Sequence, residues 1–361
     1  MNGTHFTFER RNKKSTLLTV VNPLLFAALA LAFCGIIIAA MGFHPIEVYS
    51  KMLSKAFFDI RGIRKSITAG LPLMFCGLSV SIAFRMNLNN IGAEGQYAMG
   101  AICGGAFALF GPKLPLILGL LLMFLCCFAG GAVWALICAA LKAFWDINET
   151  ITTLMLNYIA LLIMDYLMFG PWKAKGQNVG QTEKLAANFI LPNIPGTNIS
   201  CGLIIAIVLA VFMYLFYKYT TSGYQISVIK NSMTAAQYAG INIKKNILLV
   251  LGMSGGIAGL AGFVQVSGVV ERVQASMPNN AGYTGIVIAY LSNFNPIVVI
   301  IVSILFGGLQ NSSSTVQVMG VPAEIATMIQ GSIMLFVIAG EFFRRYKLTY
   351  RNFKHKGGPT K

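Results

Sequence analysis

The stretch Asn89-Asn90-Ile91-Gly92-Ala93-Glu94-Gly95-Gln96 lies between two apolar helix candidates, 66–84 and 97–110. Amide and carboxylate side chains are costly near hydrocarbon, and they persist mainly where they face a cavity, a pathway or another helix. The glycines indicate broken or closely packed backbone, which a membrane tolerates only where protein or water satisfies its polar groups. This polar stretch is therefore the first candidate for a functional site.

The composition predicts a polytopic membrane protein. The 361 residues are 56% hydrophobic and only 11% charged, with a mean hydropathy of +0.71, whereas a soluble domain carries roughly 25% charged residues. The net charge of +16 does not indicate a nucleic-acid partner, because the basic residues flank apolar segments as the positive-inside rule requires.

Ten apolar segments are candidate spans, and together they predict an all-α, polytopic transmembrane helix bundle of about ten spans. The first follows a basic stretch and exceeds a signal-peptide core of roughly 7–15 residues, so we expect an uncleaved helix. The eighth and ninth are too short to cross a ~30 Å hydrocarbon core separately and are expected to form a broken or re-entrant pair. The segments are 17–41, 66–85, 95–111, 114–141, 149–169, 201–217, 247–270, 282–292, 296–309 and 324–343.

Two related halves are also expected. The loop 170–200 is rich in glycine, proline and asparagine and divides the chain roughly in half. Asn90-Ile91-Gly92 precedes one span, as Asn280-Ala281-Gly282 precedes a later one. Transporters are often built from such repeats, with the substrate site at the repeat interface.

The distribution of basic residues predicts the topology. The basic tails 1–16 and 344–361 are expected in the cytoplasm, with a transmembrane domain over 17–343 and the loop 218–246 on the cytoplasmic side. The segment 43–65 should then lie outside, although it carries five basic residues. Its apolar spacing predicts an amphipathic helix on the outer surface, through Val48, Met52, Leu53, Ala56 and Phe57.

The motifs of common catalytic and metal chemistries are missing from the sequence. Gly252-Met253-Ser254-Gly255-Gly256 matches the GxSxG pattern of serine nucleophiles, but the three histidines lie outside the predicted spans. Glycines at this spacing are more typical of close helix packing. The sequence contains no P-loop and no HExxH or zinc-type cluster. We therefore expect no catalytic residue, no metal and no cofactor.

Two features bear on how transport would be driven. The acids Glu94, Asp165 and Glu324 leave a self-sufficient, ion-coupled secondary carrier open as an alternative. The stretch 232–239 predicts a short helix with Ser232 as its N-cap and Gly240 at its C-terminal stop. Its small alanines would suit docking in a groove of a soluble partner, but an ordinary loop helix would show the same pattern.

Four stretches carry a resemblance to a known family: 77–96, 148–158, the Ala235-Ala236-x-x-x-Gly240 segment, and 282–286 with Asn295-Pro296 and 306–309. They resemble the membrane permeases of ABC transporters, in the branch that serves simple sugars, branched-chain amino acids and nucleosides. Within that branch the chain resembles the nucleoside-type permeases that work with basic-membrane-protein lipoproteins. The usual permease pattern has an acid before the two alanines, where this chain has Thr234.

The resemblance implies a permease subunit that imports a nucleoside or a similar small polar, simple-sugar-like solute across a bacterial plasma membrane, without an ATPase site of its own. It implies an ABC ATPase on the cytoplasmic face, a second permease subunit in a heterodimer, an extracellular solute-binding lipoprotein and surrounding membrane lipid. The residues expected to couple to the ATPase are Thr234, Ala235, Ala236 and Gly240.

Six polar residues are candidates for lining the solute pathway, because ribose hydroxyls and base edges need both donors and acceptors. The alternative is that they cap helices and hold re-entrant backbone. The six are Asn90, Glu94, Gln96, Asn148, Glu149 and Asn157.

Overall fold

The computed structural model describes residues 4–10, 16–112, 114–317, 320–322 and 324–352. The ends of the predicted tails 1–16 and 344–361 lie outside these residues. The chain divides into two compact units, Phe43–Thr327 and a terminal unit of Met1–Gly42 with Met328–Lys361. The fold is all-α, as predicted, apart from one pair of short strands.

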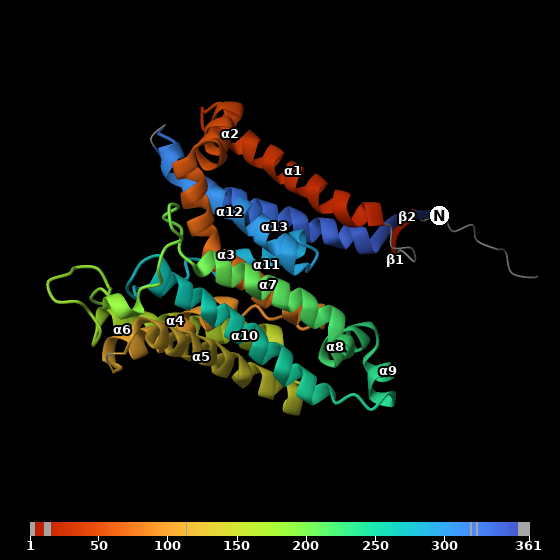
Figure 1. Ribbon diagram of the computed structural model, residues 1–361. Helices are drawn as coiled ribbons and strands as arrows, with labels where there is room; N and C mark the ends of the chain where they lie inside the picture. The colour runs from red at the N-terminus through yellow and green to blue at the C-terminus, as the bar shows by residue number, and fades with distance from the viewer. Residues whose placement is uncertain (1–3, 11–15, 113, 318–319, 323, 353–361) are drawn as a thin grey trace, which may run out of the picture. The chain divides into compact units, whose positions relative to one another are not determined.

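The larger unit contains α2 to α12 and two short helical turns. The long helices α3 to α7 follow one another, and the short helices α2, α8, α9 and α11 lie before or after this run (Figure 1). The bounds are α2 Pro45–Leu53, a π-helical turn η1 Ser54–Phe58, α3 Ile60–Arg85, α4 Ala93–Phe110, α5 Leu116–Trp145, α6 Glu149–Phe169, a 3₁₀ turn η2 Ala187–Phe189, α7 Gly202–Tyr219, α8 Thr221–Asn231, α9 Met233–Tyr238, α10 Ile243–Gly268, α11 Ala281–Leu291 and α12 Pro296–Gln317.

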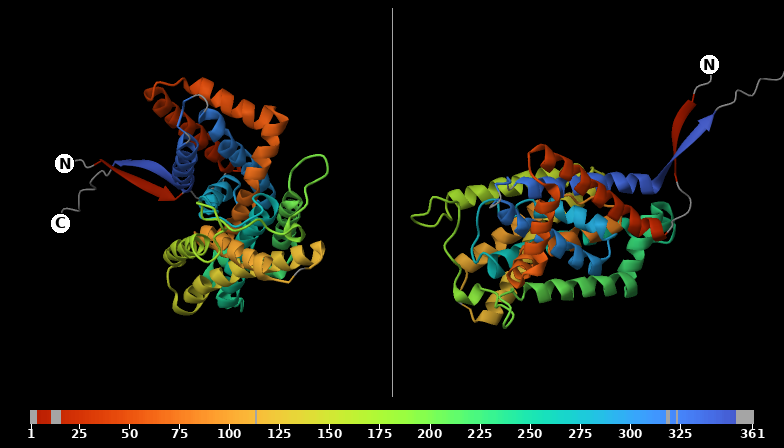
Figure 2. Two further views of the ribbon diagram at one scale, coloured as in Figure 1. Left: turned by 90° about the vertical axis from the view of Figure 1, so that its left-hand side faces the viewer. Right: turned by 90° about the horizontal axis from the view of Figure 1, so that it is seen from above.

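The terminal unit pairs α1 (Thr16–Ala40) with α13 (Glu324–Arg345), most of which belongs to this unit. The ring of Phe33 packs against that of Phe336 with 5.7 Å between centroids, and the Asn22 amide donates to the Gly340 carbonyl at 2.6 Å. Strands β1 (Thr4–Arg10) and β2 (Tyr346–Asn352) pair antiparallel, as Figure 2 shows.

Each of the ten predicted spans corresponds to a helix, and two of these helices are longer than predicted. Helix α3 begins at Ile60, and α12 continues to Gln317 with 22 residues, although only Pro296–Ser312 of α12 is apolar. The last turns of α12 are polar, so the hydropathy of the sequence did not predict that they belong to the helix. In contrast, α11 has 11 residues, about 16 Å, and remains a half-length helix. Among the described residues, five helices are long and apolar enough to cross a membrane.

Burial separates inner from outer helices in the larger unit. In α3 and α10, 78% of the most apolar window is buried, against 22–28% in α5, α6 and α7. The outer helices expose large apolar side chains such as Leu162 and Val208. Apolar faces of this extent suit lipid and not water, so α3 and α10 form the core of the bundle.

Close packing in this core depends on glycine. A Cβ atom on Gly100 of α4 would collide with the backbone of Gly259 of α10, and one on Gly131 of α5 would collide with the Gly255 carbonyl of α10. Helix α10 therefore packs against α4 and α5 backbone to backbone. The packing interpretation of the glycines around Ser254 is confirmed.

Candidate functional site

The N-termini of the half-length helix α11 and of α4 face each other inside the larger unit. A Cβ atom on Gly282, in the first turn of α11, would lie 2.7 Å from the Cα atom of Glu94, in the first turn of α4. Each helix N-terminus presents unpaired N–H groups and about half a positive charge. The two sequence stretches that echo each other therefore meet in space and form a site that favours a negative group.

Glu94 supplies that negative group. Its Oε1 accepts a hydrogen bond from the Asn280 N–H at 2.7 Å and its Oε2 accepts one from the Gly282 N–H at 2.6 Å. Only 2% of Glu94 is exposed. The carboxylate thus satisfies backbone donors at the start of α11.

The amides of Asn90 and Gln96 bind each other reciprocally. The Asn90 Nδ2 donates to Gln96 Oε1 at 3.0 Å, and the Gln96 Nε2 donates to Asn90 Oδ1 at 3.1 Å. Asn90 also donates to Ser254 Oγ at 2.8 Å, and Ser254 Oγ donates to the Ser79 carbonyl at 2.7 Å. This buried network joins the start of α4 to α10 and α3, so Ser254 serves packing in this geometry.

Asn157 of α6 holds the same stretch from the other side. Its Oδ1 accepts from the Gly95 N–H at 2.9 Å, while its Nδ2 donates to the Ile91 carbonyl at 2.8 Å and to the Tyr283 hydroxyl at 3.3 Å. Asn157 is fully buried. The loop 89–92 is therefore irregular backbone whose polar groups are satisfied by protein.

The remaining two candidates lie at the start of α6. Asn148 is the N-cap, and its Oδ1 accepts from the Thr150 N–H at 2.9 Å. Glu149 is 3.3 Å from Lys142 Nζ and accepts from the Asn89 N–H at 3.4 Å. The structure thus gathers Asn90, Glu94, Gln96 and Asn157 around the start of α4. Glu149 contacts the backbone of Asn89, shortly before α4 begins. Asn148 is exposed and does not join them.

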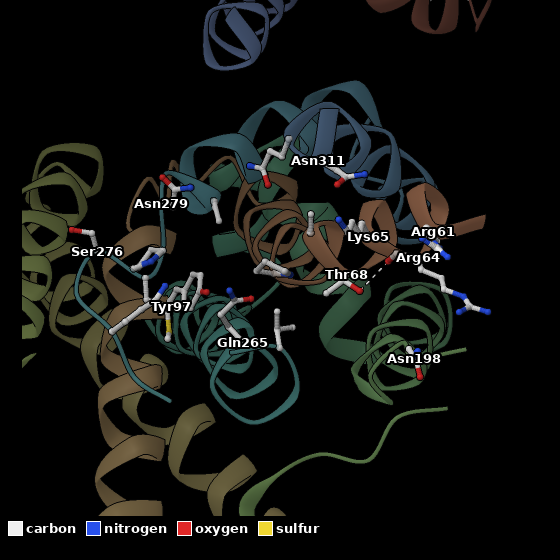
Figure 3. A pocket seen from close by; sticks show the side chains of 18 residues that line it. Arg61, Arg64, Lys65, Thr68, Tyr97, Asn198, Gln265, Ser276, Asn279 and Asn311 are labelled. Carbon is white, nitrogen blue, oxygen red and sulfur yellow. Dashed lines mark hydrogen bonds between the residues drawn. The ribbon is translucent and has the colours of Figure 1, made fainter. Parts of the chain in front are cut away.

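A cavity of about 800 Å³ lies beside this site. Its wall comes from the start of α3, from α4, from the end of α10, from the loop 274–281 and from α12 (Figure 3). None of the six candidates lines it. Its described lining contains three cationic side chains, several amides and no carboxylate.

Two polar atoms in the cavity wall lack a partner. Tyr97 is 1% exposed, and its hydroxyl makes no hydrogen bond. The buried Oε1 of Gln265 also accepts none. Tyr97 from α4 and Gln265 from α10 project into the cavity (Figure 3). Nearly all buried polar groups are satisfied in native proteins, so we single out these two atoms, which neighbouring groups cover in this structure, as candidates for contact with a polar ligand.

The basic residues near position 60 have an explanation that the sequence did not give. The predicted amphipathic helix is present as α2, with Val48 and Met52 buried, but it ends before α3 begins at Ile60. Arg61, Arg64 and Lys65 therefore occupy the first turns of α3 and line the cavity. Cations at a helix N-terminus oppose the helix dipole. Among the described residues, no carboxylate pairs with any of the three.

The 218–246 segment lies at the far end of α10 from the cavity (Figure 1). Gln265 is 22 residues after Ile243, about 33 Å along the helix. The predicted helix is confirmed as α9, with Ser232 Oγ accepting from the Ala235 N–H at 3.1 Å. Gly240 has a φ of +73°.

The exposed face of α9 differs from the one the alanines suggested. Ala236 is fully buried, whereas Thr234 and Ala235 are exposed. Tyr238 is 90% exposed and is the most prominent side chain on this short helix. Its position beside the glycine stop was visible in the sequence, but its exposure was not.

A bundle of apolar helices with a glycine-packed core, a half-length helix and a polar cavity defines a membrane transport protein. The chain belongs to the family described as branched-chain amino acid transport system / permease component, which matches residues 62–338. It is a multi-pass membrane protein of the ABC-transporter permease class, and such permease subunits are not themselves enzymes. The family works with an ATPase and a solute-binding protein, and the ion-coupled carrier alternative has no support.

Three relatives are similar over most of the chain. The glucose ABC transporter permease protein TsgB13 of Haloferax volcanii is 32% identical, covering 90% of this chain and 89% of its own. The nucleoside ABC transporter permease protein NupB of Lactococcus lactis is 29% identical, covering 88% and 90%. The guanosine ABC transporter permease protein NupP of Bacillus subtilis is 30% identical, covering 89% and 94%.

Proposed function

We propose that this permease imports a nucleoside, or a similar small polar solute such as a simple sugar, across a bacterial plasma membrane. The named substrates of its relatives, glucose, nucleosides and guanosine, support this class. ATP hydrolysis would take place on a separate ATPase subunit, and the permease itself would make no covalent change to its solute.

The observation that carries the proposal is the cavity with its two unpartnered polar atoms. Once a shift of the cavity wall uncovers these atoms, a sugar hydroxyl could donate to Gln265 Oε1 and accept from the Tyr97 hydroxyl. The cations Arg61, Arg64 and Lys65 are pure donors, so this wall favours solutes that offer carbonyl or hydroxyl acceptors. Nucleosides and sugars both meet these requirements.

In this proposal, the six polar candidates hold in place the helix ends that surround the pathway. Asn90, Glu94, Gln96 and Asn157 hold the starts of α4 and α11, which bring Tyr97 and the cavity-lining Ala281 into place. Glu149 and Asn148 fix the start of α6 behind them. Movement of these helix ends would change the shape of the cavity.

The two ends of α10 mark the faces on which two partner proteins would bind. The ATPase would dock on the α9 segment through its exposed residues Thr234, Ala235, Tyr238 and Gly240, while the buried Ala236 would hold α9 against the bundle. A solute-binding lipoprotein would deliver solute at the opposite, outer face. A second, different permease chain would complete a heterodimer within the lipid. The transmembrane domain would cover 17–343, with the tails 1–16 and 344–361 and the loop 218–246 in the cytoplasm.

Tyr97→Phe and Gln265→Leu are each expected to raise the KM of ATP-driven uptake about five- to tenfold, because one buried hydrogen bond to the solute contributes about 1 kcal/mol. Uptake of labelled uridine, guanosine and glucose by vesicles containing the complete transporter measures this. Tyr166→Phe is the matched control, since Tyr166 is 71% exposed on the outer helix α6. Unchanged kinetics in the double variant would contradict the cavity assignment, and transport of none of the three solutes would contradict the solute class.

Tyr238→Asp is expected to lower uptake at least tenfold without affecting membrane insertion, because it places a charge on the proposed docking face. The direct measurement is disulfide or bifunctional crosslinking of an Ala235→Cys variant to the ATPase. Lys173→Cys, on the loop at the other end of the bundle, is the control and should not crosslink. If α9 never crosslinks to the ATPase, the docking surface lies elsewhere.

A further inference from the structure

Arg85 ends α3 and touches two elements that are distant in sequence. Its guanidinium carbon lies 4.0 Å from the centroid of the Tyr217 ring in α7, a cation–π geometry. Its Nε donates to the Phe294 carbonyl at 3.2 Å. We refer to Arg85, Tyr217 and Phe294 as the Arg85 clasp. It joins the ends of α3 and α7 to the turn between α11 and α12.

The turn that Arg85 holds is strained. Asn293 and Phe294 have φ angles of +47° and +59°, and a bulky residue rarely adopts this left-handed region unless its surroundings enforce it. The Phe294 ring packs against those of Phe84 and Tyr290, with centroids 6.0 and 5.4 Å away. A turn held this way will change its geometry if the contacts that enforce it move.

Helix α8 contacts the clasp at both of its ends. A Cβ atom on Gly223, in its first turn, would lie 2.8 Å from the Cα atom of Tyr217. Near its other end, Lys230 Nζ lies 5.8 Å from the centroid of the Phe294 ring, and the Lys230 carbonyl accepts from Asn87 Nδ2 at 3.0 Å. Because only Ser232 separates α8 from α9, we expect displacement of α9 to move α8, which touches the clasp.

Helix α11 connects the clasp to the cavity. Its C-terminal end leads directly into the turn at Phe294. Its N-terminal end is held by Glu94, and Ala281 in its first turn lines the cavity. The 11 residues of α11 place these two ends about 16 Å apart. A rigid shift of this short helix would therefore displace both the Phe294 turn and the cavity wall at Ala281.

We propose that Arg85 is a positioning residue for coupling: it transmits displacement of α8 and α9 to the Phe294 turn and, through α11, to the cavity wall. This inference rests on the proposed docking of the ATPase on α9. Spatial continuity alone does not establish coupling, so the test measures energetic coupling directly.

The experiment uses the complete transporter in proteoliposomes and measures solute imported per ATP hydrolysed. Arg85→Gln is expected to lower this ratio at least tenfold, while transporter yield and basal ATP hydrolysis stay within about twofold of wild type. Tyr217→Leu should behave in the same way. Tyr217→Phe keeps the ring and loses only a buried hydroxyl that makes no hydrogen bond, so it should retain the wild-type ratio.

Phe144→Leu is the matched control, because it removes a ring on α5, outside the clasp, that lies 5.4 Å from Lys244 at the same end of the bundle. The double variant Arg85→Gln/Tyr217→Leu should be no worse than either single variant, as expected for one shared interaction. The proposed coupling role of the Arg85 clasp would be overturned if Arg85→Gln left the number of solute molecules imported per ATP unchanged. It would also be overturned if ATP hydrolysis and import fell by the same factor. A wild-type transporter that imports no solute with ATP would instead overturn the proposed function.

Discussion

Glu94→Ala is expected to lower the free energy of unfolding by about 1–4 kcal/mol and to abolish uptake, because one buried and one partly buried N–H group would lose their acceptor, at about 1–3 kcal/mol for the buried one. These donors belong to Asn280 and Gly282, and the carboxylate that binds both is almost fully buried. The substitution also removes the negative charge that faces two helix N-termini.

The measurement is denaturant unfolding of the purified permease in detergent, together with uptake by the complete transporter. Glu94→Gln retains one carbonyl acceptor and should show a smaller loss of stability. Glu183→Ala is the control, because Glu183 is an exposed acid on the loop 170–200 and should unfold like wild type. A stable Glu94→Ala protein that has lost only transport would show that Glu94 acts on the solute and not on α11.

Gly259→Leu is expected to prevent the permease from accumulating in the membrane, and Gly259→Ala to destabilise it by about 3 kcal/mol, at the upper end for overpacking. A Cβ atom at Gly259 would collide with the Cys127 carbonyl of α5, and Gly100 of α4 already contacts Gly259. Backbone cannot rotate away as a flexible side chain can, so the helices would have to separate.

Membrane yield and thermal unfolding of the detergent-solubilised protein measure this effect. Gly331→Ala on α13 is the control, because nothing lies within 4 Å of a Cβ atom built there, and alanine is the better helix former by up to ~1 kcal/mol. If Gly259→Ala is as stable as Gly331→Ala, the close approach of α4, α5 and α10 is not a determinant of folding.

The helices could be predicted from the sequence because hydropathy and capping are local properties. Ser232 and Asn148 cap the helices that their side chains suggested. The length of α12 could not be predicted, because its polar end packs inside the unit: Ser312 Oγ donates to the Met52 carbonyl at 2.9 Å. A polar residue with a distant partner looks like a helix end when only its neighbours in sequence are considered.

The sequence singled out the stretch around Glu94 by its polarity, and its role in a pathway stays a prediction. The partners of Glu94 are backbone N–H groups 186 and 188 positions away, which no side-chain pattern marks. The cavity escaped prediction for a related reason. Tyr97 and Gln265 are 168 positions apart, and each looks like an ordinary helix residue. One feature of the sequence did point to the cavity: Arg61, Arg64 and Lys65, which line it, disagree with the positive-inside rule.

The meeting of two helix N-termini at Glu94 has an electrical consequence. Each N-terminus carries about half a positive charge, so the two together balance the single carboxylate to about zero. A lone buried carboxylate would repel the acceptor groups of a passing solute, whereas a carboxylate that faces two helix N-termini has little net charge locally. The helix ends that frame the proposed pathway would therefore present a nearly neutral surface to an uncharged solute.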